Sequence, residues 1–289
     1  MPTTSRKTVN TSYQILGIQV DALTIEAAIA QIVAKASDPE SPAAYAVKPY
    51  VEFLERCITE PELMALLNDA EWCLSDGIAL NWAAHYLYGG RHSIWRLLGT
   101  LSQIIFMPRR LRRELPDRFG GTNFTWPLVE ETAKHNLKLY LIGSPKHQDI
   151  SVTAKLLETK IPGLRLSGYS SGQLDTRIEH KVTAEIQRLK PDIILVGMGF
   201  PLQEELIRRL MAQLDHGILI GEGGTFDYQQ FGGGARKAPK LLQKIGLEWL
   251  WRLVLEPSRF KRQLSIPRYI WHIYGQGRDM DQRASVAKH

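Results

Sequence analysis

The sequence predicts an α/β fold in which helices cover both faces of a mostly parallel sheet. Between residues 14 and 220, short runs rich in β-branched residues alternate with longer segments of helical periodicity. The 289 residues are 44% hydrophobic and 23% charged, so the chain can bury a substantial core. It contains no internal repeat and no low-complexity linker. One Rossmann-like domain with a C-terminal helical appendage is therefore the most economical interpretation.

The elements follow from this alternation in chain order. The expected strands are the short apolar runs at 14–20, 44–48, 72–75, 138–142, 165–168, 192–197 and 217–221. The expected helices fall between them, at 24–37, 61–69, 77–88, 122–135, 146–159, 178–190 and 202–214. Because a helical segment separates each strand from the next, the chain can cross over the sheet each time and the strands should run parallel.

Residues 91–118 interrupt the alternation. Apolar residues from Ile94 to Ile105 recur at helical spacing and then run into a group of arginines. This pattern predicts an amphipathic helix with a basic end that contacts an anionic membrane surface. The expected contact residues are Trp95, Arg109, Arg110, Arg112 and Arg113. Two alternatives stay open: the helix packs on the body with its arginines in solvent, or its apolar stripe forms a homo-oligomer contact.

The second interruption is the C-terminal segment, residues 246–289. It follows the last expected strand and is rich in Trp and basic residues, so we expect an appendage to an α/β core that spans residues 11–245. The Trp residues of both interruptions could lie at a bilayer interface or pack on the core.

Charge is concentrated in these two segments. The whole chain carries +6, whereas residues 91–118 and 249–278 together carry +10 and leave −4 for the rest. Such an asymmetry points to an anionic surface or ligand, but it does not establish a nucleic-acid partner. Residues 97–108 form the longest uncharged apolar stretch, which is short of the roughly 20 residues of a membrane span. The polar start and two cysteines among apolar neighbours suggest a cytoplasmic protein, peripheral at the membrane.

Several polar and glycine-rich turns follow the expected strands, where ligands of α/β sheets bind. Asp76 follows one strand and precedes a helix. Either Asp76 is a catalytic carboxylate, or Ser75 or Asp76 is an ordinary N-cap residue. The glycine clusters at 197–199 and 221–224 fail the dinucleotide fingerprint, yet their amides could approach a phosphate. The chain has no Walker lysine, no nucleophile elbow and no metal-ligand spacing. The pair Asp279-x-Asp281 resembles a metal-bound nucleotide-sugar motif, but it lies in a polar tail, so we interpret the match as accidental. We therefore expect no cofactor and no metal.

Several motifs resemble the WecB/TagA/CpsF glycosyltransferase family. They are, in chain order, Ile-Leu-Gly-Ile-Gln-Val-Asp-Ala-Leu-Thr (15–24), Ser-Asp-Gly-Ile (75–78), Gly-Met-Gly-Phe-Pro-Leu-Gln-Glu (197–204), Gly-Glu-Gly-Gly-Thr-Phe-Asp (221–227), Arg-Lys-Ala-Pro (236–239) and Gly-Leu-Glu-Trp-Leu-Trp-Arg-Leu-Val-Leu-Glu-Pro-Ser-Arg-Phe-Lys-Arg (246–262). The resemblance covers nearly all of residues 14–262.

The resemblance implies an inverting, metal-independent enzyme of bacterial cell-surface polysaccharide synthesis. It would move an N-acetylmannosamine-type sugar from a UDP donor to a polyprenyl-diphosphate-linked sugar. Asp76 matches the family's presumed general base. The residues expected at the donor are Lys48, Tyr50, Gly143, Gly197, Gly199, Gln203, Glu204, Gly223, Gly224 and Asp227. Those expected at the acceptor or diphosphate are Arg118, Arg252, Arg259 and Arg262.

The chain departs from the family pattern in three places. Lys48-Pro49-Tyr50 replaces the usual Thr-x-Asn, Leu202 replaces a basic residue, and the connection from Gly89 to Arg118 is longer and more basic than is common. The main alternative from another class is a non-catalytic module that docks on membrane or nucleic acid. A sugar-nucleotide epimerase is disfavoured because the dinucleotide fingerprint is missing.

Overall fold

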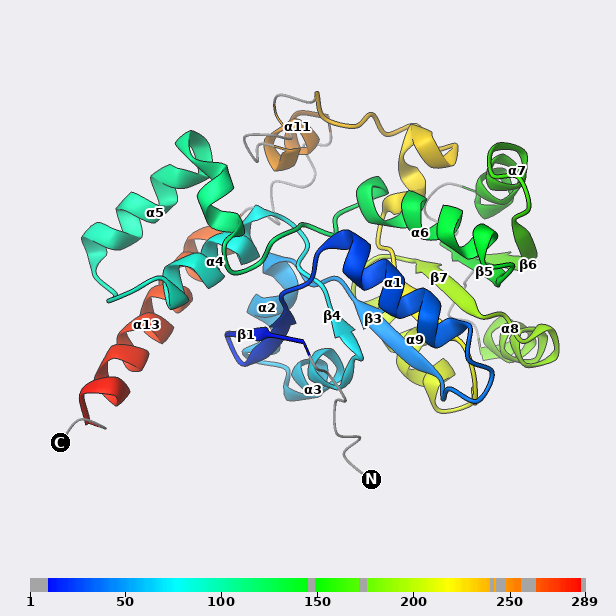
Figure 1. The fold of residues 1–289 in the computed structure, drawn as a ribbon, viewed down its shortest axis with the longest axis horizontal. Helices are drawn as coiled ribbons and strands as arrows, with labels where there is room; N and C mark the ends of the chain where they lie inside the picture. The colour runs from blue at the N-terminus through cyan, green and yellow to red at the C-terminus, as the bar shows by residue number, and fades with distance from the viewer. Residues whose placement is uncertain are drawn as a thin grey trace.

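The computed structural model describes residues 10–144, 149–171, 176–239, 242, 248–255 and 264–286. Its centre is a six-stranded parallel sheet with strand order β4-β3-β8-β7-β5-β6 (Figure 1). The strands are β3 (Ala44–Val47), β4 (Trp72–Cys73), β5 (Lys138–Gly143), β6 (Arg165–Ser171), β7 (Ile193–Gly197) and β8 (Ile218–Gly221). The predicted α/β class and parallel order are confirmed.

The expected strand at 14–20 is wrong. The chain reverses at Leu16 and Gly17, whose φ angles are 48° and 85°, so this segment is a hairpin of β1 (Ser12–Ile15) and β2 (Ile18–Asp21). The hairpin forms a separate antiparallel sheet. It is fixed to the main sheet by Asp21, whose Oδ2 accepts a hydrogen bond of 2.7 Å from the amide of Cys73.

Helices cover both faces of the main sheet (Figure 1). Strand residues alternate between the two layers: Tyr45 and Val47 join one apolar cluster, and Ala44 and Ala46 join the other. The first layer holds α2 (Val51–Cys57), α3 (Pro61–Asp69), α4 (Ile78–Tyr88), α8 (Thr176–Leu189), α9 (Leu202–Met211) and α13 (Ser265–Val286). The second holds α1 (Ile25–Ala36), α6 (Thr122–Lys134) and α7 (Ile150–Lys160). Of these sheet-covering helices in the first 240 residues, only the short α2 was not expected from the sequence.

The insertion forms the amphipathic helix that was predicted. It consists of α5 (Ile94–Phe106) and the 3-10 helix η1 (Pro108–Arg112). Ser93 caps α5, because its hydroxyl accepts a hydrogen bond of 3.1 Å from the amide of Arg96. One face of α5 packs on α4, where Leu97 is buried and the indole of Trp82 donates to Thr100. Leu111 and Leu115 are fully buried, so the insertion is part of the molecular body.

The C-terminal segment contributes α11 (Glu248–Leu255) and α13. Tyr269 and Ile273 of α13 are buried against α2 and α4, so this helix shares the core of the domain. Asp281, the second carboxylate of the Asp-x-Asp pair, accepts hydrogen bonds from the amide and ring of His92. Among the described residues, no helix combines the length and the hydropathy that a membrane span requires.

Candidate active site

The C-terminal edge of the sheet brings the glycine-rich turns and Asp76 together. The turns after β7 and β8 are neighbours, because Val196 pairs with Gly221. The segment after β4 adjoins the segment after β3, since the amide of Asp76 donates to the carbonyl of Pro49 over 3.1 Å. This edge is where ligands of parallel α/β sheets bind, and Asp76 and the glycine turns lie there as their positions after the strands predict.

Asp76 is half-buried immediately before α4. The N-cap position of α4 belongs to Gly77, which has a φ of 88°, and the hydroxyl of Ser75 donates to the carbonyl of Asp117 instead. The alternative interpretation of Ser75 or Asp76 as the N-cap residue is therefore wrong. The left-handed backbone at Gly77, which glycine adopts at low cost, ends the strand segment and leaves Asp76 outside the helix.

The loop that follows the insertion packs directly on Asp76. The amide of Phe119 donates to the carbonyl of Ser75 over 2.8 Å. A Cβ added at Gly120 would lie 2.5 Å from Asp76 Oδ1, so only glycine allows this approach of the loop to the carboxylate. The half-buried Arg118 belongs to the same loop. Sequence analysis missed Gly120, although the Gly-Gly pair after Arg118-Phe119 was a signal of close approach.

A buried ion pair joins the ends of β3 and β8. Lys48 Nζ lies 2.7 Å from Glu222 Oε2, and their side chains are 5% and 0% exposed. Thr125 of α6 donates to the same carboxylate oxygen, and the Lys48 ammonium also lies 5.1 Å from the centre of the Phe124 ring. Lys48 was expected at the donor, and the structure uses its charge to neutralise Glu222. Glu222 and Thr125 were missed because they are far from Lys48 in sequence.

The Gln203-Glu204 pair lies beneath the glycine turn after β8. Gln203 Oε1 accepts a hydrogen bond of 2.7 Å from the amide of Gly223, and its Nε2 donates to Glu204 over 2.6 Å. Both side chains are buried. Through the hydrogen bond to Gly223, the pair fixes the position of the turn after β8 and of its backbone amides.

Burial raises the pKa of Glu204 to about 8, although the hydrogen bond from Gln203 opposes this shift. Its Oε2 has no hydrogen-bond partner among the described residues. Burial therefore favours the neutral form of this carboxyl group, because a buried charge without an oppositely charged partner is costly.

The remaining glycine candidates have two kinds of role. Gly143 and Gly197 are paired on β5 and β7, and a side chain at either would collide with Ile150 or Phe226, so both permit close packing. Gly199 and Gly223 have φ angles of 74° and 58°, which glycine adopts without strain. Two other residues were expected at the donor. Asp227 lies beside Gly224 in the 3-10 turn that follows β8. The hydroxyl of Tyr50 donates a hydrogen bond to the carboxylate of Glu52.

The arginines expected at the diphosphate are only partly described. Arg252 belongs to α11, and Arg259 and Arg262 lie outside the described residues. A cation that sequence analysis missed is Lys237 of the Arg-Lys-Ala-Pro motif, whose Nζ donates to Thr122 and Asn123 at the start of α6, over 2.7 Å in each case.

Comparison with known proteins decides the family. The model of the glycosyl transferase WecG/TagA/CpsF family matches residues 13–101 and 102–283. The chain belongs to this family. The resemblance seen in the motifs is thus confirmed, and the family favours glycosyl transfer over a non-catalytic docking module. Asp76, Gly120, the Lys48–Glu222 pair and the Gln203-Glu204 pair all fall within the matched residues.

Two relatives of the chain carry the same name, N-acetylglucosaminyldiphosphoundecaprenol N-acetyl-beta-D-mannosaminyltransferase. The protein of Bacillus subtilis (strain 168) is 32% identical over 166 residues, which are 57% of this chain and 63% of that relative. The protein of Bacillus spizizenii (strain ATCC 23059 / NRRL B-14472 / W23) is 26% identical over 229 residues, which are 79% of this chain and 76% of that relative. The chain therefore spans just under two thirds of the first relative.

Removal of the Lys48 cation should destabilise the fold strongly. Lys48→Met leaves the Glu222 carboxylate buried without its ion-pair partner, and we expect the free energy of unfolding to fall by about 3–5 kcal/mol. The double variant Lys48→Met/Glu222→Gln removes both charges and should recover at least half of this loss. Urea denaturation measures both values, and a double variant no more stable than the single one would contradict the interpretation.

Glu204 should make stability depend on pH. Its folded-state pKa of about 8 lies above the ordinary value of 4.5, so between these values the folded protein keeps a proton that the unfolded chain releases. Stability should therefore fall as pH rises from about 4.5 to about 8, by at most a few kcal/mol at 1.4 kcal/mol per pKa unit. Glu204→Gln should remove this part of the profile, as measured by denaturation at pH 5, 6.5 and 8. Parallel profiles for the two proteins would refute it.

Proposed function

We propose that the protein transfers an N-acetylmannosamine-type sugar, with inversion, from a UDP donor to the N-acetylglucosamine of a polyprenyl-diphosphate-linked acceptor. The names of the two relatives support this sugar and this acceptor. The observation that carries the proposal for this chain is the Asp76 carboxylate at the C-terminal edge of the sheet, with Gly120 packed against it. Such a carboxylate is the group that a single-displacement glycosyl transfer needs.

In the proposed reaction Asp76 accepts the proton of the acceptor hydroxyl. The hydroxyl oxygen attacks the anomeric carbon on the face opposite the UDP, a new C–O bond forms, and the bond to UDP breaks. The electron pair of that bond leaves with UDP, so one displacement inverts the anomeric centre. The proton on Asp76 passes to solvent after the product leaves.

The negative charge that develops on UDP must be stabilised by amides or cations. Because Glu222 neutralises Lys48, we assign this role to the glycine turns after β7 and β8 and to Lys237, whose ammonium contacts the start of α6. Arg118, Arg252, Arg259 and Arg262 stay proposed contacts of the diphosphate. Independence from metal ions rests on the family resemblance, and activity that persists in EDTA would support it.

The acceptor is anchored in a bilayer by its polyprenyl chain, so we propose that the enzyme works as a peripheral protein at the cytoplasmic membrane face. Incubation of the purified protein with a panel of UDP-sugars and a lipid-diphosphate-N-acetylglucosamine acceptor tests the function. A product heavier by one N-acetylhexosamine supports the proposal. No product with any UDP-sugar would overturn it.

Asp76→Asn should lower turnover by about 100-fold or more, because the amide keeps the shape of the side chain but cannot accept the proton. Donor binding, measured by titration with UDP, should change little. Asp149→Asn is a matched control, since Asp149 caps α7 and asparagine caps equally well. Near-normal turnover of Asp76→Asn would exclude Asp76 as the base.

Gly120→Ala should lower turnover about 10-fold to 100-fold, because the new Cβ would displace the Asp76 carboxylate from its present position. The φ of Gly120 is not in the left-handed region, so the effect is steric and the melting temperature should fall by only a few degrees. Gly275→Ala on the exposed side of α13 meets no atom within 4 Å and serves as the control. Equal turnover of the two variants would show that Gly120 does not position Asp76.

A further inference from the structure

The outer face of α5 is apolar and open to solvent. Trp95 is 79% exposed and Phe106 is 77% exposed, and Leu98 and Ile105 between them are about half exposed. The spacing of these four residues places them along one side of the helix, opposite the buried Leu97. Exposed apolar side chains also occur elsewhere, as at Val152 and Tyr169, but these four share one face of a single helix. A continuous apolar strip of this kind marks an interaction site.

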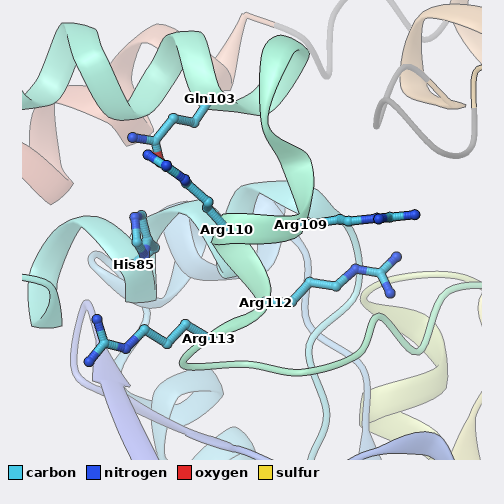
Figure 2. A pocket seen from close by; sticks show the side chains of 6 residues that line it. All are labelled: His85, Gln103, Arg109, Arg110, Arg112 and Arg113. Atoms are coloured by element: carbon cyan, nitrogen blue, oxygen red, sulfur yellow. The ribbon is translucent and has the colours of Figure 1, made fainter.

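The C-terminal end of α5 leads directly into a basic hollow. The hollow has a volume of about 460 Å³ and is lined by His85, Gln103, Arg109, Arg110, Arg112 and Arg113. Figure 2 shows Arg109 and Arg112 extending to the same side, while Arg110 reaches toward Gln103. Among the described residues, only Arg112 of these four arginines has a carboxylate within 4.0 Å, that of Asp117. The hollow therefore holds positive charge that the rest of the described chain does not neutralise.

We propose that α5 and η1 together dock the protein on an anionic phospholipid surface. The exposed face of α5 lies among the acyl chains, and the arginine hollow takes the phosphates of the headgroups. The two parts match the two layers that a bilayer surface presents, because the apolar strip ends where the arginines begin. Guanidinium groups bind phosphate oxygens through paired N–H donors, so this chemistry suits a headgroup.

A second copy of the chain fits this surface poorly. Residues 91–113 contain six arginines and no acidic residue, with Arg91 and Arg96 near the start of α5 and the other four at or beyond its end. A symmetric contact through α5 would bring arginines against arginines in either helix orientation. An anionic membrane supplies the missing negative charge, and the charge pattern thus favours lipid over self-association.

The docking surface adjoins the proposed catalytic carboxylate. Arg112 lies 4.0 Å from the carboxylate of Asp117, and the carbonyl of Asp117 accepts a hydrogen bond from Ser75, the neighbour of Asp76. Docking through η1 would therefore bring the sheet edge with Asp76 to the membrane surface. The inference rests on the proposed function only in placing the acceptor at the membrane. The vesicle-binding test contains neither donor nor acceptor, so its outcome is independent of the proposed activity.

Co-sedimentation with vesicles tests the docking surface. The full-length protein should bind phosphatidylglycerol vesicles at low salt at least tenfold more strongly than phosphatidylcholine vesicles, and 0.5 M NaCl should weaken this binding. Changing Arg109, Arg110, Arg112 and Arg113 to Gln should lower binding to the anionic vesicles at least tenfold. A matched control changes four exposed cations of α7 and α8, at the opposite end of the molecule in Figure 1, to Gln: Lys155, Lys160, Lys181 and Arg188.

A second pair of variants tests the apolar face. Trp95→Ser/Phe106→Ser should lower binding to anionic vesicles at least tenfold, whereas Val152→Ser/Tyr169→Ser, which changes exposed apolar residues elsewhere, should not. Melting temperatures within a few degrees of wild type establish that these variants are folded. Equal binding by the arginine variant and its control would overturn the proposal. A second outcome would also overturn it: light scattering shows a concentration-dependent dimer, Trp95→Ser/Phe106→Ser abolishes this dimer, and the same variant binds vesicles as well as wild type.

Discussion

The buried pair of Lys48 and Glu222 is the interaction on which the candidate site depends. Two opposite charges at the ends of adjacent strands must leave water together, and desolvation makes this arrangement costly unless further polar contacts compensate. The Thr125 hydroxyl and the Phe124 ring supply such contacts from α6. The pair thereby fixes three elements relative to one another: β3, β8 and the start of α6. Two segments that contact Asp76, at Pro49 after β3 and at Gly120 before α6, adjoin these elements.

Turns at the same edge of the sheet pack closely because glycines in them carry no side chain. Gly120 approaches the Asp76 carboxylate, Gly197 lies under Phe226, and Gly221 lies on the amide of Gln203, each at a distance that a Cβ would not allow. Glycine is costly in chain entropy, and here the cost is offset by close packing of turns on one another. The result is a set of backbone amides and one carboxylate held in fixed positions, which is the preorganisation that catalysis by charge stabilisation requires.

Local pattern was sufficient for most of the fold but not for the contacts of the site. Runs such as Ile193–Gly197 and Ile218–Gly221 are buried on both faces and therefore carry a clear strand signal. The hairpin was missed because Leu16, a residue that rarely adopts a positive φ, occupies the turn with Gly17. Motif matching located Asp76 and Gln203, whereas the partnership of Lys48 with Glu222 joins residues far apart in the sequence and becomes visible only with the strand order.

The attachment of α5 to the rest of the domain determines how a membrane contact would orient the protein. At its start, His92 is buried and bound to Asp281 of α13, and the amide of His92 lowers the pKa of that carboxyl group. At its end, Leu111 and Leu115 are buried, and Asn81 donates to the carbonyl of Leu115. A helix fixed at both ends to α4 and α13 cannot swing as a flexible arm. A bilayer bound to its outer face would therefore orient the whole sheet, so the distance between Asp76 and the membrane surface would be set by the fold.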